Sequence, residues 1–137
     1  MGYVNHEIKR DRKFIVDCLL EGLARLDYRG YDSTGLVVDG DANNEVVPFK
    51  MVGKVSDLKH SIDLSGVDLS RMFTSHAGIA HTRWAANGSA TVSNCHPIRY
   101  AAFLVLSCTC SSVALTYRAC AVAPTKRGDS RWSTTAL

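Results

Sequence analysis

Regularly spaced apolar side chains in residues 11–26 restrict the folds open to this chain more than any other feature. The apolar positions recur every three or four residues, which is the period of one face of an α-helix. They are Phe14, Ile15, Cys18, Leu19, Gly22, Leu23 and Leu26. Asp11 is a suitable N-cap, and Gly30 is expected to end the helical region. The chain therefore needs an apolar surface for this helix to cover, and Cys18 is interpreted as a small buried hydrophobe.

The segments around this helix have the composition of a sheet with a second helix. The expected order is strand, helix, strand, strand, helix, strand, at residues 2–5, 11–26, 33–38, 45–52, 53–63 and from His76 onward. Pro48 predicts that its strand lies at an edge or carries a bulge. Residues 64–75 are expected to be a polar connection. This order favours an α+β fold, with helices layered on a sheet.

Composition indicates one globular domain and argues against a nucleic-acid partner. The 137 residues are 46% hydrophobic and 21% charged, which is ordinary for such a domain. The net charge of +3 comes from residues 100–137, because the preceding residues hold 12 basic and 12 acidic side chains. No basic stripe with interleaved aromatic residues is present in the sequence.

Five cysteines stand at positions 18, 95, 108, 110 and 120, and the first residues have no apolar core of the kind that directs secretion. Reduced thiols and a cytoplasmic location are therefore expected. A zinc site built on Cys108, Cys110, Cys120 and a histidine is an alternative, although the paired spacings of known zinc sites are missing. We expect no metal and no cofactor.

Residues 78–88 combine a buried-strand pattern with polar side chains at the point where the strand should end. The apolar run is followed by Thr82, Arg83 and Trp84, which lead into a turn that Asn87 and Gly88 are expected to close. A guanidinium group held there can bind both oxygens of a carboxylate, a geometry that lysine does not reproduce. The alternative is that Arg83 is solvated or pairs with a structural acid.

Four segments together resemble a known family. They are residues 2–5 (GYVN), 28–35 (YRGYDSTG), 78–85 (GIAHTRWA) and 94–97 (NCHP). Over residues 2–99 the chain is similar to the glutaminase domain of glutamine–fructose-6-phosphate aminotransferases, which open hexosamine synthesis by making glucosamine 6-phosphate. The resemblance implies a four-layer αββα sandwich of the N-terminal-nucleophile hydrolase type. We therefore expect residues 1–99 to form a partial type-2 amidotransferase domain and residues 100–137 to form a divergent, unstructured tail.

The family's reaction uses a cysteine as the first residue of the mature protein, with its own α-amine as the general base. The family's opening Met-Cys-Gly-Ile-Phe-Gly-Tyr-Val-Asn is shortened here to Met-Gly-Tyr-Val-Asn. No catalytic residue can therefore be assigned, and the chain alone is expected to be inactive. The Asn-Gly pair that the family carries after its His-Pro motif, and from which its oxyanion hole is built, has no counterpart in residues 100–137, and the isomerase half is not found either.

The resemblance implies a ligand site for L-glutamine. Arg83 corresponds to the arginine that binds the α-carboxylate, and Trp84 to the tryptophan that closes the site and gates the passage of ammonia. Ala86 and Asn87 replace a threonine and a histidine of the family, which should weaken binding. Arg29 and Asp32 are expected to fix the corner between helix and strand through local hydrogen bonds. Reading Asp32 and Ser33 as part of a serine hydrolase is disfavoured, because no Gly-x-Ser-x-Gly elbow surrounds Ser33.

The uncharged residues 100–117 leave further interpretations open. A membrane anchor is disfavoured, because the apolar run is shorter than the roughly 20 residues that spanning requires. A tail without selected structure is the preferred interpretation. Three hypotheses follow for the chain: a partial glutaminase domain, a non-catalytic relative that binds glutamine or full-length amidotransferase subunits, and an unstable truncated product.

Overall fold

The computed structural model describes residues 1–29, 32–42, 45–85, 88–100, 103–107 and 114–118. The elements are β1 (Gly2–Asn5), β2 (Arg10–Asp11), α1 (Arg12–Ala24), the 3₁₀ turn η1 (Asp27–Arg29), β3 (Ser33–Asp39), β4 (Val46–Val52), α2 (Val55–Asp63), β5 (Met72–Phe73), β6 (His76–Arg83), the 3₁₀ turn η2 (Val92–Asn94), β7 (Ile98–Tyr100), β8 (Phe103–Ser107) and β9 (Ala114–Arg118). The six strands and helices predicted for the first 83 residues occur in the predicted order, but the structure adds the short strands β2 and β5, the latter within the segment expected to be a polar connection.

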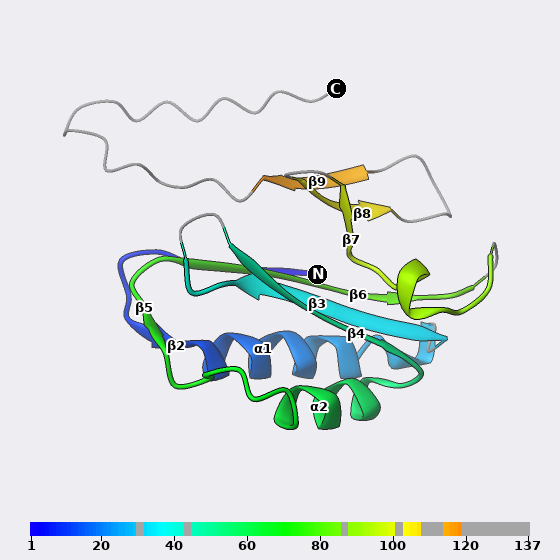
Figure 1. Ribbon diagram of the computed structural model, residues 1–137, viewed down its shortest axis with the longest axis horizontal. Coiled ribbons are helices and arrows are strands. Elements are labelled where there is room, and N and C mark those ends of the chain that lie inside the picture. The colour runs from blue at the N-terminus through cyan, green and yellow to red at the C-terminus, as the bar shows by residue number, and fades with distance from the viewer. Residues whose placement is uncertain (30–31, 43–44, 86–87, 101–102, 108–113, 119–137) are drawn as a thin grey trace.

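An antiparallel sheet with the strand order β1-β6-β3-β4 forms the centre of the molecule (Figure 1). Strand β3 lies between β6 and β4, and its pairing with β6 extends from Val38 opposite Gly78 to Ser33 opposite Arg83. Pro48 lies on β4, which is the edge strand that the sequence predicted, and it is paired with Val37. The sheet therefore brings the end of β6 next to the beginning of β3.

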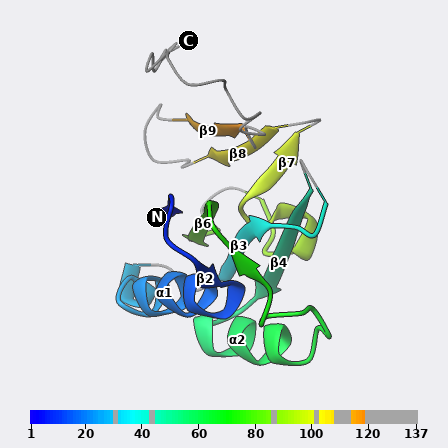
Figure 2. The same ribbon diagram turned by 90° about the vertical axis from the view of Figure 1, so that its left-hand side faces the viewer.

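Helices α1 and α2 cover one face of this sheet (Figure 2). The core between the two layers consists of aliphatic side chains that are 0–2% exposed, among them Ile15, Leu19, Leu23, Leu36, Val38, Leu58 and Ile62. Each such side chain contributes about 1.5–3 kcal/mol of stability through burial. The apolar period in residues 11–26 thus selects the face of α1 that packs on the sheet.

Two details of α1 differ from the sequence-based prediction. Asp11 is the N-cap, as predicted, and its carboxylate accepts a 2.9 Å hydrogen bond from the backbone N–H of Phe14. The side chain of Phe14 is partly exposed rather than buried in the core, whereas Arg12 is completely buried. The helix also ends at Ala24, two residues earlier than predicted, and η1 follows.

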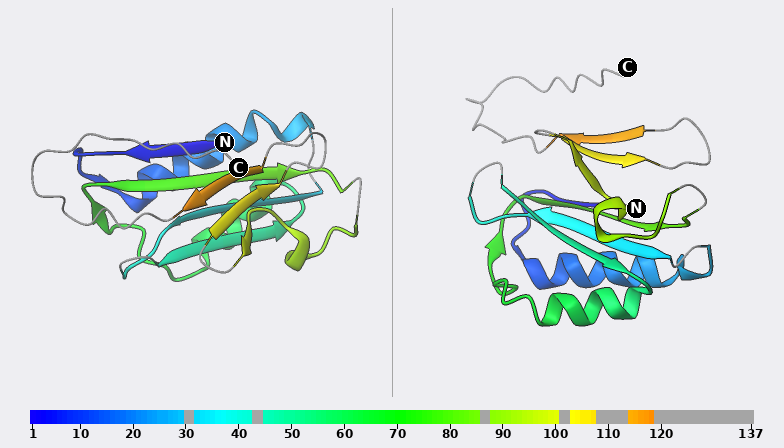
Figure 3. Two further views of the ribbon diagram at one scale, coloured as in Figure 1. Left: turned by 90° about the horizontal axis from the view of Figure 1, so that it is seen from above. Right: turned by 45° about the vertical axis from the view of Figure 1, so that its right-hand side comes forward.

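A second antiparallel sheet, with the order β7-β8-β9, lies on the side of the central sheet opposite the helices (Figure 3). Strand β7 crosses the position after residue 99 at which the sequence analysis divided the chain, and β8 and β9 follow it. The α+β class is confirmed, while the four-layer sandwich and the domain division remain predictions. In the part of the chain that the structure describes, no helix is long and apolar enough to cross a membrane.

Candidate functional site around Arg83

Arg83 is the last residue of β6, and the sheet buries it there. It is paired with Ser33, the first residue of β3, and its side chain is 7% exposed. Its Nη2 lies 3.4 Å from the carbonyl oxygen of Gly88, to which it donates a hydrogen bond. Gly88 has a φ of +79°, a conformation that glycine adopts without strain. The chain therefore turns back after β6, so that Gly88 lies next to the guanidinium group of Arg83.

A hydrogen bond from a residue distant in the sequence holds the backbone just after Arg83. Asp32 Oδ2 accepts a 2.8 Å hydrogen bond from the backbone N–H of Ala85. The motif of Asp32 predicted local hydrogen bonds at the helix–strand corner, whereas this bond joins two residues that are 53 positions apart. Trp84, between Arg83 and Ala85, is 68% exposed. Ala86 and Asn87, and the side chain of Arg29, lie outside the described residues.

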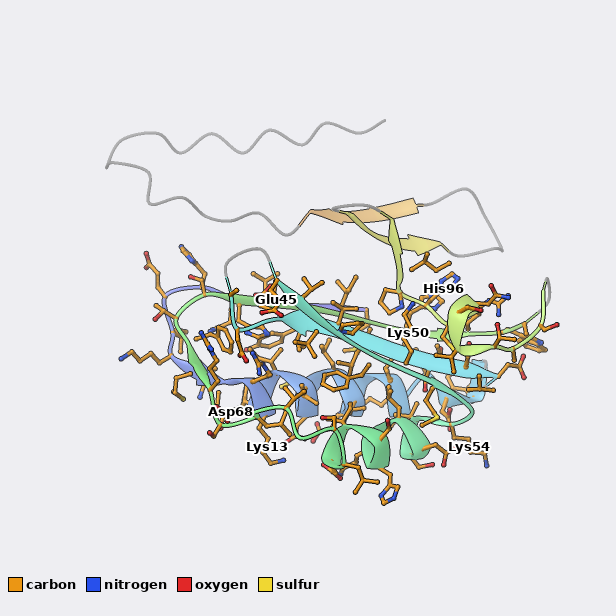
Figure 4. All side chains as sticks on the ribbon, in the orientation of Figure 1. Lys13, Glu45, Lys50, Lys54, Asp68 and His96 are labelled. Carbon is orange, nitrogen blue, oxygen red and sulfur yellow. The ribbon has the colours of Figure 1, made fainter. Side chains whose placement is uncertain are left out.

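A glycine beside Arg83 makes room for the segment that carries His96. Gly35 of β3 lies between Lys50 of β4 and His81 of β6 in the register of the sheet. A Cβ atom on Gly35 would lie 2.1 Å from the carbonyl oxygen of His96, so only glycine allows this approach. The His96 ring lies 5.0 Å from the His81 ring, centroid to centroid. Figure 4 shows Lys50 and His96 on the sheet face opposite the helices.

The two imidazoles are surrounded by other basic groups. Burial lowers the pKa of His81 to about 4, and the nearby His96 and the terminal ammonium of Met1 add to the effect. Burial also lowers the pKa of His96, with Arg83 and Lys50 contributing. Both rings are therefore mainly neutral at pH 7. Their Nδ1 atoms are buried without a hydrogen-bond partner. From the sequence neither histidine was assigned to the site, and Lys50 carried no signal that linked it to this cluster.

Strand β1 runs antiparallel to β6 and pairs with the part of β6 that precedes Arg83. The terminal ammonium of Met1 donates a 2.8 Å hydrogen bond to the carbonyl oxygen of Ala80, and the Ala80 N–H donates back to the carbonyl oxygen of Met1 at 2.9 Å. Because β1 and β6 are antiparallel, each residue upstream on one strand corresponds to one residue downstream on the other. Arg83 lies three positions beyond Ala80. A residue three positions before Met1 would therefore lie opposite Arg83.

The cysteines that the structure describes have other surroundings. Cys18 is partly buried on α1, and Cys95 is buried next to His96. The Cys95 thiol lies 3.2 Å from the carbonyl oxygen of Thr91 and 3.5 Å from that of Met51. These contacts give Cys95 a packing role, which agrees with the usual behaviour of buried thiols. Cys108, Cys110 and Cys120 lie outside the described residues.

Two further features of the described chain bear on where a ligand could bind. Among the described residues, no group of three or more histidine, cysteine, aspartate or glutamate side chains is arranged to hold a metal ion. Described residues line a hollow of about 650 Å³ beside α2 and another of about 510 Å³ between α1 and α2, and neither lining includes Arg83. Arg83 is therefore singled out by its buried charge and not by a hollow in the surface.

Comparison with curated proteins identifies relatives of this chain, although no protein-family profile matches it. The chain is 50% identical over 98 residues to a Schizosaccharomyces pombe protein named "probable glutamine–fructose-6-phosphate aminotransferase (isomerizing)". It is 49% identical over 98 residues to the glutamine–fructose-6-phosphate aminotransferase of Saccharomyces cerevisiae. Both matches cover 72% of this chain and 14% of the relative. An Arabidopsis thaliana enzyme of the same name is 39% identical over 101 residues, covering 70% of this chain and 15% of the relative.

The chain spans only about one seventh of the length of these relatives. The matched share of this chain corresponds in extent to the segment that carries the four motifs. Over about 70% of its length, the chain is a homologue of part of the glutamine–fructose-6-phosphate aminotransferases.

Proposed function

We propose that this chain carries the glutamine-binding side of a type-2 glutaminase domain, with Arg83 as the group that binds the ligand's α-carboxylate. One observation carries the proposal: Arg83 is buried at a strand end, and its guanidinium group donates a hydrogen bond to the carbonyl oxygen of Gly88. A buried guanidinium group with a fixed direction is suited to bidentate recognition of a carboxylate. The homology supports glutamine as the ligand, because the relatives are named for a glutamine-dependent reaction.

Hydrolysis of the bound glutamine requires a nucleophile near Arg83. In the register of β1 and β6, a residue three places before Met1 would lie opposite Arg83, which supports this proposal. Of the cysteines that the structure describes, Cys18 lies on α1 and Cys95 is engaged with backbone carbonyls. We therefore propose that a polypeptide of residues 1–137 binds glutamine but does not release ammonia from it.

The remaining roles in this site are proposals of the same kind. Trp84 is exposed and follows Arg83 directly, which suits a side chain that closes over a ligand. Ala86 and Asn87 would contribute less to binding than the threonine and histidine of the family, because each substitution removes a hydrogen-bonding group or changes its geometry. Arg29 would support the corner before β3. We propose a cytoplasmic protein that binds L-glutamine and needs no cofactor, with full-length amidotransferase subunits as an alternative partner.

Isothermal titration calorimetry with L-glutamine tests the proposal. We expect binding by the unmodified chain, and a loss of about tenfold or more in affinity for Arg83→Lys, because lysine cannot form the second charge-assisted hydrogen bond. Arg71→Lys is the matched control, since Arg71 lies near the opposite end of the sheet, where it pairs with Asp41. Equal affinity of the parent and Arg83→Lys, or no binding by the parent, would contradict the proposal.

A further inference from the structure

The hydrogen bond between Asp32 and Ala85 lies at the place where the ladder of β3 and β6 ends. The last pair of that ladder is Ser33 opposite Arg83. One residue further out, the side chain of Asp32 reaches across to the backbone N–H of Ala85 at 2.8 Å. The carboxylate therefore continues the connection between the two strands beyond their last backbone pair.

Asp32 is itself held in place from the other side of β3. Its backbone carbonyl accepts a 3.1 Å hydrogen bond from the N–H of Gly53, which follows β4. Gly53 has a φ of +120°, so a residue with a side chain would be strained there. Asp32 thus links the chain after β4 to the chain after β6, with β3 between them.

The consequence concerns the direction of Arg83. Arg83 precedes Ala85 by two residues, and the chain then returns so that the Gly88 carbonyl lies 3.4 Å from Arg83 Nη2. The hydrogen bond from Ala85 to Asp32 fixes the first step of this return. Without this hydrogen bond, the chain would be free to leave β6 in another direction. The Gly88 carbonyl would then no longer be held next to the guanidinium group of Arg83.

We propose that Asp32 is a positioning residue for carboxylate binding: it holds the backbone after β6 so that the guanidinium group of Arg83 keeps a binding-competent direction. The proposal rests on the proposed function of Arg83. It assigns to Asp32 a role beyond the local hydrogen bonding at the helix–strand corner that its motif suggested. Asp32 acts through Arg83 and does not touch the ligand.

The opposite end of the same strand pair provides a matched control. Asp39 Oδ2 accepts a 2.8 Å hydrogen bond from the backbone N–H of Ala77 near the beginning of β6. The residue types, the donor, the distance and the pair of strands are the same as for Asp32 and Ala85. Loss of either carboxylate should reduce stability, but only Asp32 adjoins Arg83.

The test compares Asp32→Ala, Asp32→Asn and Asp39→Ala by calorimetric titration with L-glutamine, all in a Trp132→Phe background. In that background Trp84 is the only tryptophan, and its fluorescence anisotropy reports the order of the chain after β6. We expect Asp32→Ala to weaken glutamine binding by about tenfold and to lower the anisotropy, because a charge-assisted hydrogen bond is lost. Asp32→Asn should retain binding to within about threefold, because its amide oxygen can still accept from Ala85. Asp39→Ala should bind like the parent.

The outcomes separate this proposal from the one on which it rests. Absence of binding by the parent chain overturns both. Binding by the parent that is retained in Asp32→Ala, or lost equally in Asp39→Ala, overturns the positioning role alone, as does equal loss in Asp32→Asn and Asp32→Ala. If Asp32→Ala does not fold, Asp32→Glu replaces it, because its carboxylate is displaced by one methylene group; full affinity of a folded Asp32→Glu would overturn the proposal.

Discussion

The Nη2 atom of Arg12 lies 2.7 Å from Oδ1 of Asp41, and this ion pair joins the beginning of α1 to the turn after β3. Arg12 is completely buried, and its Nη1 also donates to the carbonyl oxygen of Asp68 at 2.8 Å. Arg71 Nη1 lies 3.1 Å from the same oxygen of Asp41. The carboxylate of Asp41 therefore forms ion pairs with two guanidinium groups, at the end of the sheet that is remote from Arg83.

The ion pair between Arg12 and Asp41 predicts how the thermal stability of the protein depends on pH. The hydrogen bond from Arg12 lowers the pKa of Asp41. A carboxylate with a lowered folded-state pKa contributes stability above its unfolded value, near 3.9, and loses it as the pH falls through the lower folded value. We expect Asp41→Asn to lower the thermal midpoint at pH 7, and the difference from the parent to shrink below about pH 3. Asp17→Asn, which breaks an exposed pair with Lys13, should have a small effect. A deficit of the same size at pH 2 and pH 7 would exclude this account.

Gly35 is predicted to tolerate no side chain. A Cβ atom there would lie 2.1 Å from the His96 carbonyl oxygen and 3.0 Å from that of Phe49, and both are backbone atoms. We expect Gly35→Ala to reduce the free energy of unfolding by about 1–3 kcal/mol, the usual cost of overpacking. Urea unfolding measures the change. Gly2→Ala on β1 is the control, because its Cβ would meet nothing closer than 3.8 Å. An unchanged urea midpoint for Gly35→Ala would show that the His96 segment does not lie against β3.

The buried histidine His81 predicts a second pH effect of a different origin. Burial lowers its pKa to about 4, below the unfolded value of 6.5. The unfolded state binds this proton first, so the histidine lowers stability as the pH falls from 6.5 toward 4. We expect the thermal midpoint of the parent to decrease across this interval, and that of His81→Gln to decrease less steeply. His76, with a pKa of about 4, keeps part of the slope in the variant. Identical slopes in the parent and in His81→Gln would refute the prediction.

The register of β1 predicts where an added nucleophile would lie. Replacing Met1 by Cys-Gly-Ile-Phe extends β1 by three residues, and the new cysteine would lie opposite Arg83. We expect an electrophilic glutamine analogue to alkylate this cysteine, and L-glutamine to protect it. Mass spectrometry of peptides identifies the labelled residue, and the corresponding serine extension is the control. Labelling of Cys95 instead, or labelling that glutamine does not reduce, would speak against a ligand site at Arg83.

The sequence predicted the central layers well, because their determinants are local. The apolar period of residues 11–26 and the β-branched run of residues 33–38 each reflect one face packed on one core. The two-residue strands β2 and β5 were missed, since pairs such as Arg10 with Phe73 leave no periodic signal. Burial of Arg12 was also missed, because it depends on Asp41 and Asp68, which are distant in sequence.

Among the site residues, Arg83 could be singled out from its place after an apolar run, and it is buried at the end of β6. Its role in binding a ligand stays a prediction. The partnership of Asp32 with Ala85 could not be found, because it depends on the register between β3 and β6. The same holds for the approach of the His96 carbonyl to Gly35, which joins two strands and the segment after η2.

The central claim is that Arg83 binds the α-carboxylate of glutamine, and one comparison of ligands on the unmodified chain tests it directly. Calorimetric titration with L-glutamine is set against titration with 4-aminobutanamide, which has the same amine and side-chain amide but no α-carboxylate. The account predicts that glutamine binds at least about tenfold more tightly, since a buried charge-assisted pair is lost without the carboxylate. Equal affinity for the two ligands would contradict it.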